Sequence, residues 1–164
     1  MRTHDELDPE HWTLMADVLD PAVPPAAARA RFVAQIRGPQ RLGPFAGEIA
    51  TTFGVDRDAT LAALARVDEP SAWRPGLLPG ARIMKLDAGP HARVMLARLE
   101  SGARVPRHGH TTRERTYVVQ GSLREDGVTT HGPGALLDMA PGTEHELLAA
   151  DGAECIVVFG EDRA

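Results

Sequence analysis

The spacing of apolar residues along the chain changes between Pro70 and Pro79. Before this stretch, apolar residues recur at intervals of three and four, which is the spacing of amphipathic helices. After it, short apolar runs alternate with turns rich in Gly and Pro, as in a β-sandwich or barrel. The pattern therefore predicts a helical extension over residues 1–72 and a mainly β domain over residues 73–164.

Four helices are expected in the N-terminal part. Pro24-Pro25 suits the first turn of a helix, where the missing N–H groups would be unpaired anyway, and Gly38-Pro39 ends that helix. Gly54 should end the next helix along the chain, and Asp56 is a plausible N-cap for the helix after it. The expected helical segments are Pro9–Leu19, Ala26–Arg37, the segment that carries Phe45, Ile49 and Phe53 on one face, and the segment that carries Leu61, Leu64 and Val67.

Six short strands are expected in the C-terminal part, separated by turns such as Gly89-Pro90 and Gly132-Pro133-Gly134. Their expected bounds are Ala81–Leu86, Val94–Leu99, Arg115–Gln120, Ala135–Met139, Glu146–Ala149 and Cys155–Phe159. The helices must bury their apolar stripes, so we expect them to pack on the outside of the barrel or across a dimer contact. Because edge strands are commonly covered by a partner subunit, we expect a homodimer.

The main candidate chemistry lies in the β half of the chain. His108 and His110 are two residues apart, so on a strand their side chains point to the same face. The step from His110 to Glu114 is also even, which permits the same facing if the chain turns between two paired strands. A third imidazole, His145, follows a Pro-Gly turn. Three imidazoles and one carboxylate that converge on one point make a divalent-metal site.

These residues resemble the cupin superfamily. Its first motif, G-x5-HxH-x3,4-E-x6-G, is matched at every position by Gly102, His108, His110, Glu114 and Gly121. Its second motif, G-x5-P-x-G-x2-H-x3-N, is matched loosely and in order by Gly134, Pro141, Gly142 and His145, with Ala149 in place of the final Asn. The resemblance implies an RmlC-like double-stranded β-helix, which is a jelly-roll barrel, behind an N-terminal helical extension.

The resemblance also implies one divalent metal ion per chain, with His108, His110, Glu114 and His145 as its ligands. Four protein ligands on an octahedral ion leave two positions open, where a small-molecule ligand, a substrate or oxygen could coordinate. The donor set suits Zn, Fe, Mn or Ni and does not choose among them. Each histidine must be neutral to bind the ion, so acid should weaken binding.

The residues after Glu114 predict the wall beside this site. Tyr117 is at odd spacing from Glu114 and should face away, whereas Thr116 and Val118 share the inward face. The wall is then largely apolar, with no obvious acid–base partner. Catalytic residues therefore remain unassigned.

The other candidate side chains are expected to have structural roles. Glu144 should face away from the site beside its neighbour, and His91 and His131 are expected to be solvated histidines in turns rich in Gly and Pro. Cys155 opens an apolar strand and should be a small buried hydrophobe. As the single cysteine, it also excludes an internal disulfide and a zinc site made of several thiolates.

A second resemblance is to ChrR-type anti-sigma factors, most closely in their cupin half. The segments that carry it are Pro21–Phe32, Trp73–Arg82 and Leu123–Gly127. The resemblance implies a sigma factor as a candidate partner. In those regulators an N-terminal zinc domain with His and Cys ligands holds the sigma factor. No cysteine precedes Cys155 here, so that zinc site is not expected and sigma-factor binding stays open.

Charge and composition narrow the classes of partner. The net charge of −5 argues against a nucleic-acid partner. The segment Ile49–Asp56 resembles a helix-turn-helix, but the helix that follows holds Asp56, Asp58 and few basic groups, so ordinary helix packing is expected. The first residues are polar and acidic, with no apolar run long enough for a signal peptide or a membrane span. We therefore expect a cytoplasmic protein with no membrane partner.

Two functional classes remain open. In the first, the protein is a metal-binding cupin that senses a small molecule or a redox or stress signal and is related to ChrR-type regulators of transcription. In the second, it is a small metal-dependent enzyme, such as a dioxygenase, isomerase or lyase, that acts on a metal-chelating organic acid. The absence of an obvious acid or base near Glu114 slightly favours the first class.

Overall fold

The computed structural model describes residues 25–90, 92–150, 152 and 154–162, and the chain divides into two compact units, residues 1–37 and 38–164. In the first unit, helix α2 spans Ala26–Arg37, which are the bounds predicted. The carbonyl of Pro25 accepts the first hydrogen bonds, from the N–H groups of Ala28 and Arg29, at 2.8 and 3.0 Å. The expected helix Pro9–Leu19 lies outside the described residues.

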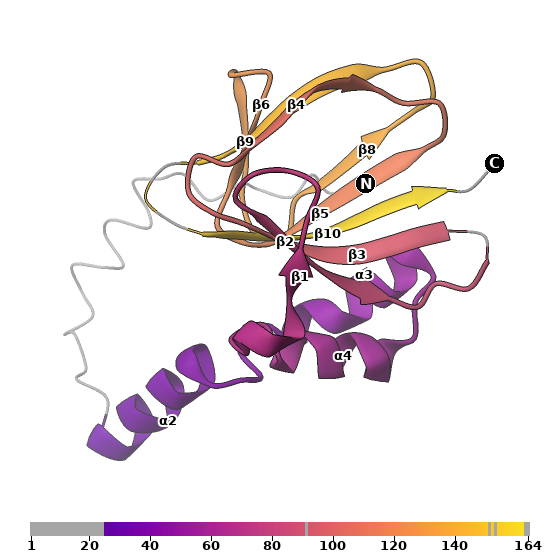
Figure 1. The fold of residues 1–164 in the computed structure, drawn as a ribbon. Helices are drawn as coiled ribbons and strands as arrows, with labels where there is room; N and C mark the ends of the chain where they lie inside the picture. Colours follow the sequence, from indigo (N-terminus) through magenta and orange to yellow (C-terminus); the bar gives the residue numbers. More distant parts are fainter. Residues whose placement is uncertain (1–24, 91, 151, 153, 163–164) are drawn as a thin grey trace, which may run out of the picture. The chain divides into compact units, whose positions relative to one another are not determined.

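The second unit contains two antiparallel sheets (Figure 1). The six-stranded sheet has the order β1-β2-β3-β10-β5-β8, and the four-stranded sheet has the order β4-β9-β6-β7. The strands are β1 Arg74–Pro75, β2 Ala81–Leu86, β3 Ala92–Leu99, β4 Arg104–Gly109, β5 Glu114–Gln120, β6 Leu123–Glu125, β7 Thr129–His131, β8 Leu136–Met139, β9 Glu144–Ala149 and β10 Cys155–Asp162. Non-consecutive strands are neighbours in both sheets, as in a jelly roll. The mainly β prediction is confirmed.

Two helices cover one face of the six-stranded sheet (Figure 1). They are α3, Ala46–Phe53, and α4, Arg57–Ala65, and the short 3-10 helices η1, Gly43–Phe45, and η2, Pro70–Ala72, flank them. Gly54 ends α3 in the left-handed conformation at φ 64°, and the side chain of Asp56 caps α4 by accepting the N–H of Ala59 at 2.8 Å. Both predicted boundaries are confirmed. Within the described residues, every helix falls short of the length and apolar character that a membrane span requires.

Alternation along β10 divides the buried residues into two layers. Ile156 and Val158 face the helices, whereas Cys155 and Val157 face the four-stranded sheet. The inner layer joins both sheets, because Leu123 and Leu147 of the four-stranded sheet belong to the same cluster. The two sheets therefore enclose one apolar interior.

The outer layer explains the glycine near the end of β10. A Cβ atom added to Gly160 would lie 2.4 Å from Cδ1 of Phe53, which is closer than real contacts allow. Phe53 is 6% exposed and lies at the end of α3. The bare backbone of Gly160 is therefore what lets this helix pack closely on the sheet.

Tyr117 belongs to the outer layer, and its predicted orientation away from the candidate site is confirmed. Its hydroxyl donates a hydrogen bond to Glu48 of α3 at 2.7 Å. Burial, together with that hydrogen bond and the charge of Glu48, raises the pKa of Tyr117 to about 12. This contact ties the helical layer to β5, the strand that begins with Glu114.

Candidate metal centre

The four predicted ligands come from both sheets and meet at one place. His108 on β4 and His145 on β9 are direct cross-strand partners, so their side chains share a face. Glu114 is the first residue of β5, in the other sheet. His110 follows β4, where its N–H donates to the carbonyl of Thr143 at 3.0 Å and its own carbonyl accepts from Gly142 at 2.8 Å. The Pro-Gly turn before β9 therefore holds His110 beside His145.

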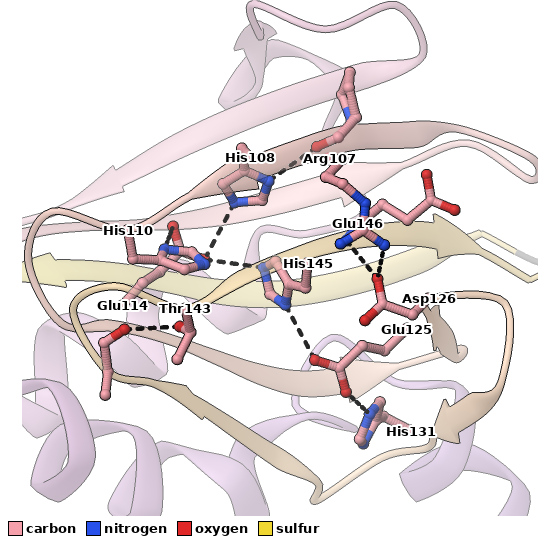
Figure 2. A network of polar contacts seen from close by, with 12 residues as sticks. Arg107, His108, His110, Glu114, Glu125, Asp126, His131, Thr143, His145 and Glu146 are labelled. Carbon is pink, nitrogen blue, oxygen red and sulfur yellow. Dashed lines mark hydrogen bonds and ion pairs between the residues drawn. The ribbon is translucent and has the colours of Figure 1, made fainter.

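The three imidazole rings form a nearly equilateral group (Figure 2). Their centroids lie 4.9, 4.8 and 4.9 Å apart for the pairs His108–His110, His108–His145 and His110–His145. Oε1 of Glu114 lies 3.7 Å from Nε2 of both His108 and His145. One ligand atom from each of the four residues can be chosen so that all lie within 4.8 Å of one another.

This geometry fits a shared ion. Around an octahedral ion, two ligand atoms bound at about 2.1 Å lie roughly 3.0 Å apart in adjacent positions and roughly 4.2 Å apart in opposite positions. The separations of 3.7 Å from Glu114 fall between these values. Nε2 of His110, Nε2 of His145 and Oε1 of Glu114 are also buried without a hydrogen-bond partner. Buried polar atoms are rarely left unpaired, so these three neighbouring atoms are compatible with a shared cation.

Hydrogen bonds fix the proton of two imidazoles on the nitrogen away from the centre. Nδ1 of His108 lies 2.9 Å from the carbonyl oxygen of Pro106, which can only accept, so this nitrogen is the donor. Nδ1 of His145 lies 3.1 Å from Oε1 of Glu125. In both neutral rings the lone pair is then on Nε2, the nitrogen that faces Glu114.

The electrostatics of the group also favour a cation. Burial raises the pKa of Glu114 to about 7, and the charge of Glu161 adds to this while His108 opposes it. Burial lowers the pKa of His110, as do His108 and His145, against the charge of Glu161. Without an ion, the carboxylate is difficult to ionise and this imidazole is difficult to protonate. A divalent cation would stabilise the ionised carboxylate beside neutral imidazoles.

His131 differs from its prediction as a solvated loop histidine. It is the last residue of β7 and is half-buried, and its Nε2 lies 2.9 Å from Oε2 of Glu125. Glu125 therefore bridges His131 and His145. Burial opposes ionisation of Glu125, but the hydrogen bonds and charges of the two histidines outweigh it and lower its pKa. The β6–β7 hairpin brings these two residues together, and its two three-residue strands are too short to show periodicity.

Most other side chains near the centre lie as predicted. Thr116 and Val118 are buried on the inward face, at 1% and 0% exposure, and Glu144 is exposed. Cys155 is buried, and burial, with the nearby Glu154, raises its pKa to about 12, so it is an inert thiol. His91 lies outside the described residues.

Glu161 is an acidic residue that the sequence reasoning missed. It is paired directly with Glu114 across β10 and β5, so both side chains lie on the same face. Glu161 is 45% exposed and lies 3.7 Å from Arg93. The expected strand ended at Phe159, because the charged residues that follow interrupt the apolar run.

A jelly roll with three histidines and one glutamate at the junction of its sheets defines the cupin class. The profile of the ChrR cupin-like domain matches residues 63–162, and the chain belongs to this family. A protein of Cereibacter sphaeroides provisionally named dimethylsulfoniopropionate lyase DddL is 29% identical over 127 residues. That match covers 69% of this chain and 53% of the relative, so the chain spans about half the length of this curated protein.

Solved structures support the fold. A chain in the crystal structure of Rhodobacter sphaeroides SigE in complex with the anti-sigma ChrR is 24% identical, with a TM-score of 0.56, and the match covers 93% of this chain and 75% of that one. An RmlC-like cupin from Shewanella frigidimarina is 18% identical, with a TM-score of 0.50, over 58% of this chain and 87% of that one. The predicted cupin fold and the relation to ChrR are confirmed.

Proposed function

We propose that this protein is a metal-binding cupin that senses a small molecule or a redox or stress signal, as a relative of ChrR-type anti-sigma regulators. The observation that carries the proposal is the set of buried, unpartnered atoms on His110, Glu114 and His145 that face one another. Together with His108 they would hold one Zn, Fe, Mn or Ni ion. A bound ion would supply a Lewis acid or, if it is iron, a redox centre.

A small-molecule ligand is supported by the residues on the inward face. Thr116 lies two residues after Glu114, is 1% exposed, and its hydroxyl oxygen is buried without a hydrogen-bond partner. A ligand that coordinates the ion and presents a polar atom to this hydroxyl would satisfy it. Phe159 and Leu137 are direct cross-strand partners of Thr116, so the same face offers an apolar surface for the rest of the ligand.

Metal binding is tested by elemental analysis of protein purified without added metal, followed by titration with zinc, manganese and ferrous iron. We expect about one ion per chain in the wild type and loss of high-affinity binding in His145→Ala and Glu114→Ala. Glu144→Gln is the matched control, because Glu144 is exposed and adjacent to His145. A wild-type protein that remains free of metal in every titration would refute the proposal.

A sigma factor is the partner class that the relation to ChrR suggests. The test is size-exclusion chromatography of this protein mixed with Rhodobacter sphaeroides SigE, and with the sigma factor encoded nearest to its own gene. Co-elution that changes when the metal is removed supports a sensor. Separate elution with and without metal leaves the protein without a role in sigma-factor control.

The enzymatic alternative is favoured by the relation to DddL and by the position of Glu161. A lyase that eliminates a group from an organic acid removes a proton beside the carboxylate, and Glu161 offers a base on the same face as Glu114. The test substrate is dimethylsulfoniopropionate, with release of dimethyl sulfide as the readout, and oxygen uptake with metal-chelating acids tests an oxygenase. Turnover that Glu161→Gln abolishes without loss of the metal would favour the enzyme.

A further inference from the structure

Glu125 lies between the candidate metal centre and a fourth histidine, His131 (Figure 2). Its Oε1 accepts from Nδ1 of His145 at 3.1 Å, and its Oε2 lies 2.9 Å from Nε2 of His131. The side chain of His145 is 1% exposed, whereas those of Glu125 and His131 are 21% and 20% exposed. The contacts therefore form a short chain that leads from the buried centre toward the surface.

The β6–β7 hairpin places this carboxylate. Glu125 is the last residue of β6 and pairs with Leu147 of β9, which puts its side chain on the same inner face as His145, two residues earlier on β9. Asp126 and Gly127 follow with φ of 49° and 71°, so the chain reverses directly after Glu125.

The turn that follows Glu125 is hydrogen-bonded to β9. Asp126 donates its N–H to the carbonyl of Glu146 at 3.1 Å, and Oδ1 of its side chain accepts the N–H of Glu146 at 3.1 Å. Arg107 on β4 donates to the same Oδ1 at 2.7 Å. These contacts hold the hairpin against β9 beside His145. The position of Glu125 is therefore fixed by the sheet.

We propose that Glu125 is the positioning residue of the metal centre, which holds the proton of His145 on Nδ1 and so presents the Nε2 lone pair to the ion. A neutral imidazole carries one proton, and an acceptor at one nitrogen keeps the proton there. His131 donates to the other oxygen of Glu125 and fixes the plane of the carboxylate. The inference rests on the proposed metal binding and adds two residues, Glu125 and His131, that are not ligands.

The acceptor of the Nδ1 proton differs between His108 and His145. A backbone carbonyl, that of Pro106, accepts the proton of His108, and no side-chain substitution removes it. The proton of His145 depends on one side chain, so its orientation is the one that a substitution can release. Carboxylates and carbonyls behind ligating histidines generally tune metal affinity by about 10–100-fold.

The first measurement is the dissociation constant of zinc, by competition with a chromophoric chelator at about pH 8, where free histidine is neutral. We expect Glu125→Ala to weaken zinc binding by about 10–100-fold. Glu125→Gln should recover most of the loss, because its amide oxygen still accepts the Nδ1 proton. Glu144→Gln, which removes an exposed charge next to His145, should bind zinc as the wild type does. If Glu125→Gln binds zinc as weakly as Glu125→Ala, Glu125 acts through its charge and the positioning role is wrong.

The second measurement is the tautomer of His145 in the metal-free protein, by long-range proton–nitrogen correlation spectra of its imidazole. The wild type and Glu125→Gln should carry the proton on Nδ1, and Glu125→Ala should shift it toward Nε2. A wild-type ring protonated on Nε2 would overturn the inference without any reference to metal affinity. The folded state of each variant is read from the same spectra.

The role of His131 is tested by a double-mutant cycle. His131→Ala should weaken zinc binding less than Glu125→Ala, and it should have no further effect when Glu125 is already Ala. Additive losses would show that His131 acts independently of Glu125.

The outcomes separate this inference from the proposed function. If the wild type binds no ion, both fail. If the wild type binds zinc and Glu125→Ala binds it equally tightly, the metal-binding proposal stands and the positioning role fails.

Discussion

Replacement of Glu114 by Gln should change the stability of the protein in opposite directions with and without metal. In the metal-free protein, the buried carboxylate has a pKa of about 7, against an ordinary value of 4.5. Below about pH 4.5 the group is protonated in both the folded and the unfolded chain, so it has no effect on the free energy of unfolding. As the pH rises toward 7, the unfolded chain ionises first, and the folded state loses stability. Above about pH 7 the loss is complete.

The size of the effect follows from that difference. At about 1.36 kcal/mol per pKa unit, a rise from 4.5 to about 7 corresponds to roughly 3 kcal/mol. The side chain of His108, which neighbours Glu114, is 31% exposed, and solvent on that side reduces the penalty. We therefore expect metal-free Glu114→Gln to be more stable than the metal-free wild type by about 1–3 kcal/mol at about pH 8, and equally stable at about pH 4.5.

With metal the order should reverse. An ion at 1,000 times its dissociation constant stabilises the folded wild type by about 4.1 kcal/mol, which exceeds the advantage of the metal-free variant, and the variant loses most of this gain. The assay is urea denaturation of both proteins at the two pH values, with a chelator and with excess zinc. A metal-free wild type that is more stable than Glu114→Gln at about pH 8 would refute the assignment of a buried, hard-to-ionise carboxylate at this position.

Three further predictions test the fold around the centre. Tyr117→Phe removes the hydrogen bond to Glu48 and should lower the free energy of unfolding by about 1–2 kcal/mol, with zinc affinity unchanged; an unaltered urea midpoint would contradict this. Gly160→Ala should destabilise the protein by about 1–3 kcal/mol, because the new Cβ atom would clash with the Phe53 ring. In the double variant, Phe53→Leu should relieve part of that loss. Strictly additive losses of the two substitutions would count against the contact. The protein should be a homodimer, because β8 is an edge strand with Leu136 exposed. Light scattering should give twice the chain mass of 17.6 kDa, and a mass of one chain at micromolar concentration would rule this out.

The candidate metal centre could be predicted from the sequence because its signal is local. His108 and His110 need only the two-residue period of a strand to share a face, and the even step to Glu114 extends it. The turn before His145 is marked by its own Pro and Gly. The structure brings these four side chains together, and metal binding itself stays a prediction.

Glu161 could not be found in this way, because it reaches the centre by pairing between strands. Glu161 is placed by the register of β10 against β5, which joins residues 47 positions apart (161 minus 114). The hairpin that carries Glu125 and His131 does have a local signal, since Asp-Gly is a strong hairpin turn. That turn signal would have placed Glu125 and His131 on adjacent strands.

The way the two sheets are joined at the candidate metal centre bears on the proposed sensor function. The inner apolar cluster links the sheets through residues such as Val118 and Leu147, which follow the candidate ligands by four and two positions on β5 and β9. Beyond them, the facing side chains are Glu114 from one sheet and His108 and His145 from the other, and without an ion their contacts contain unpartnered polar atoms. An ion would therefore hold the sheets together where apolar contact ends. Its loss would loosen that end, where Glu125 contacts His145, while the cluster keeps the rest folded. A change confined to one end of a stable barrel is what a reversible sensor requires.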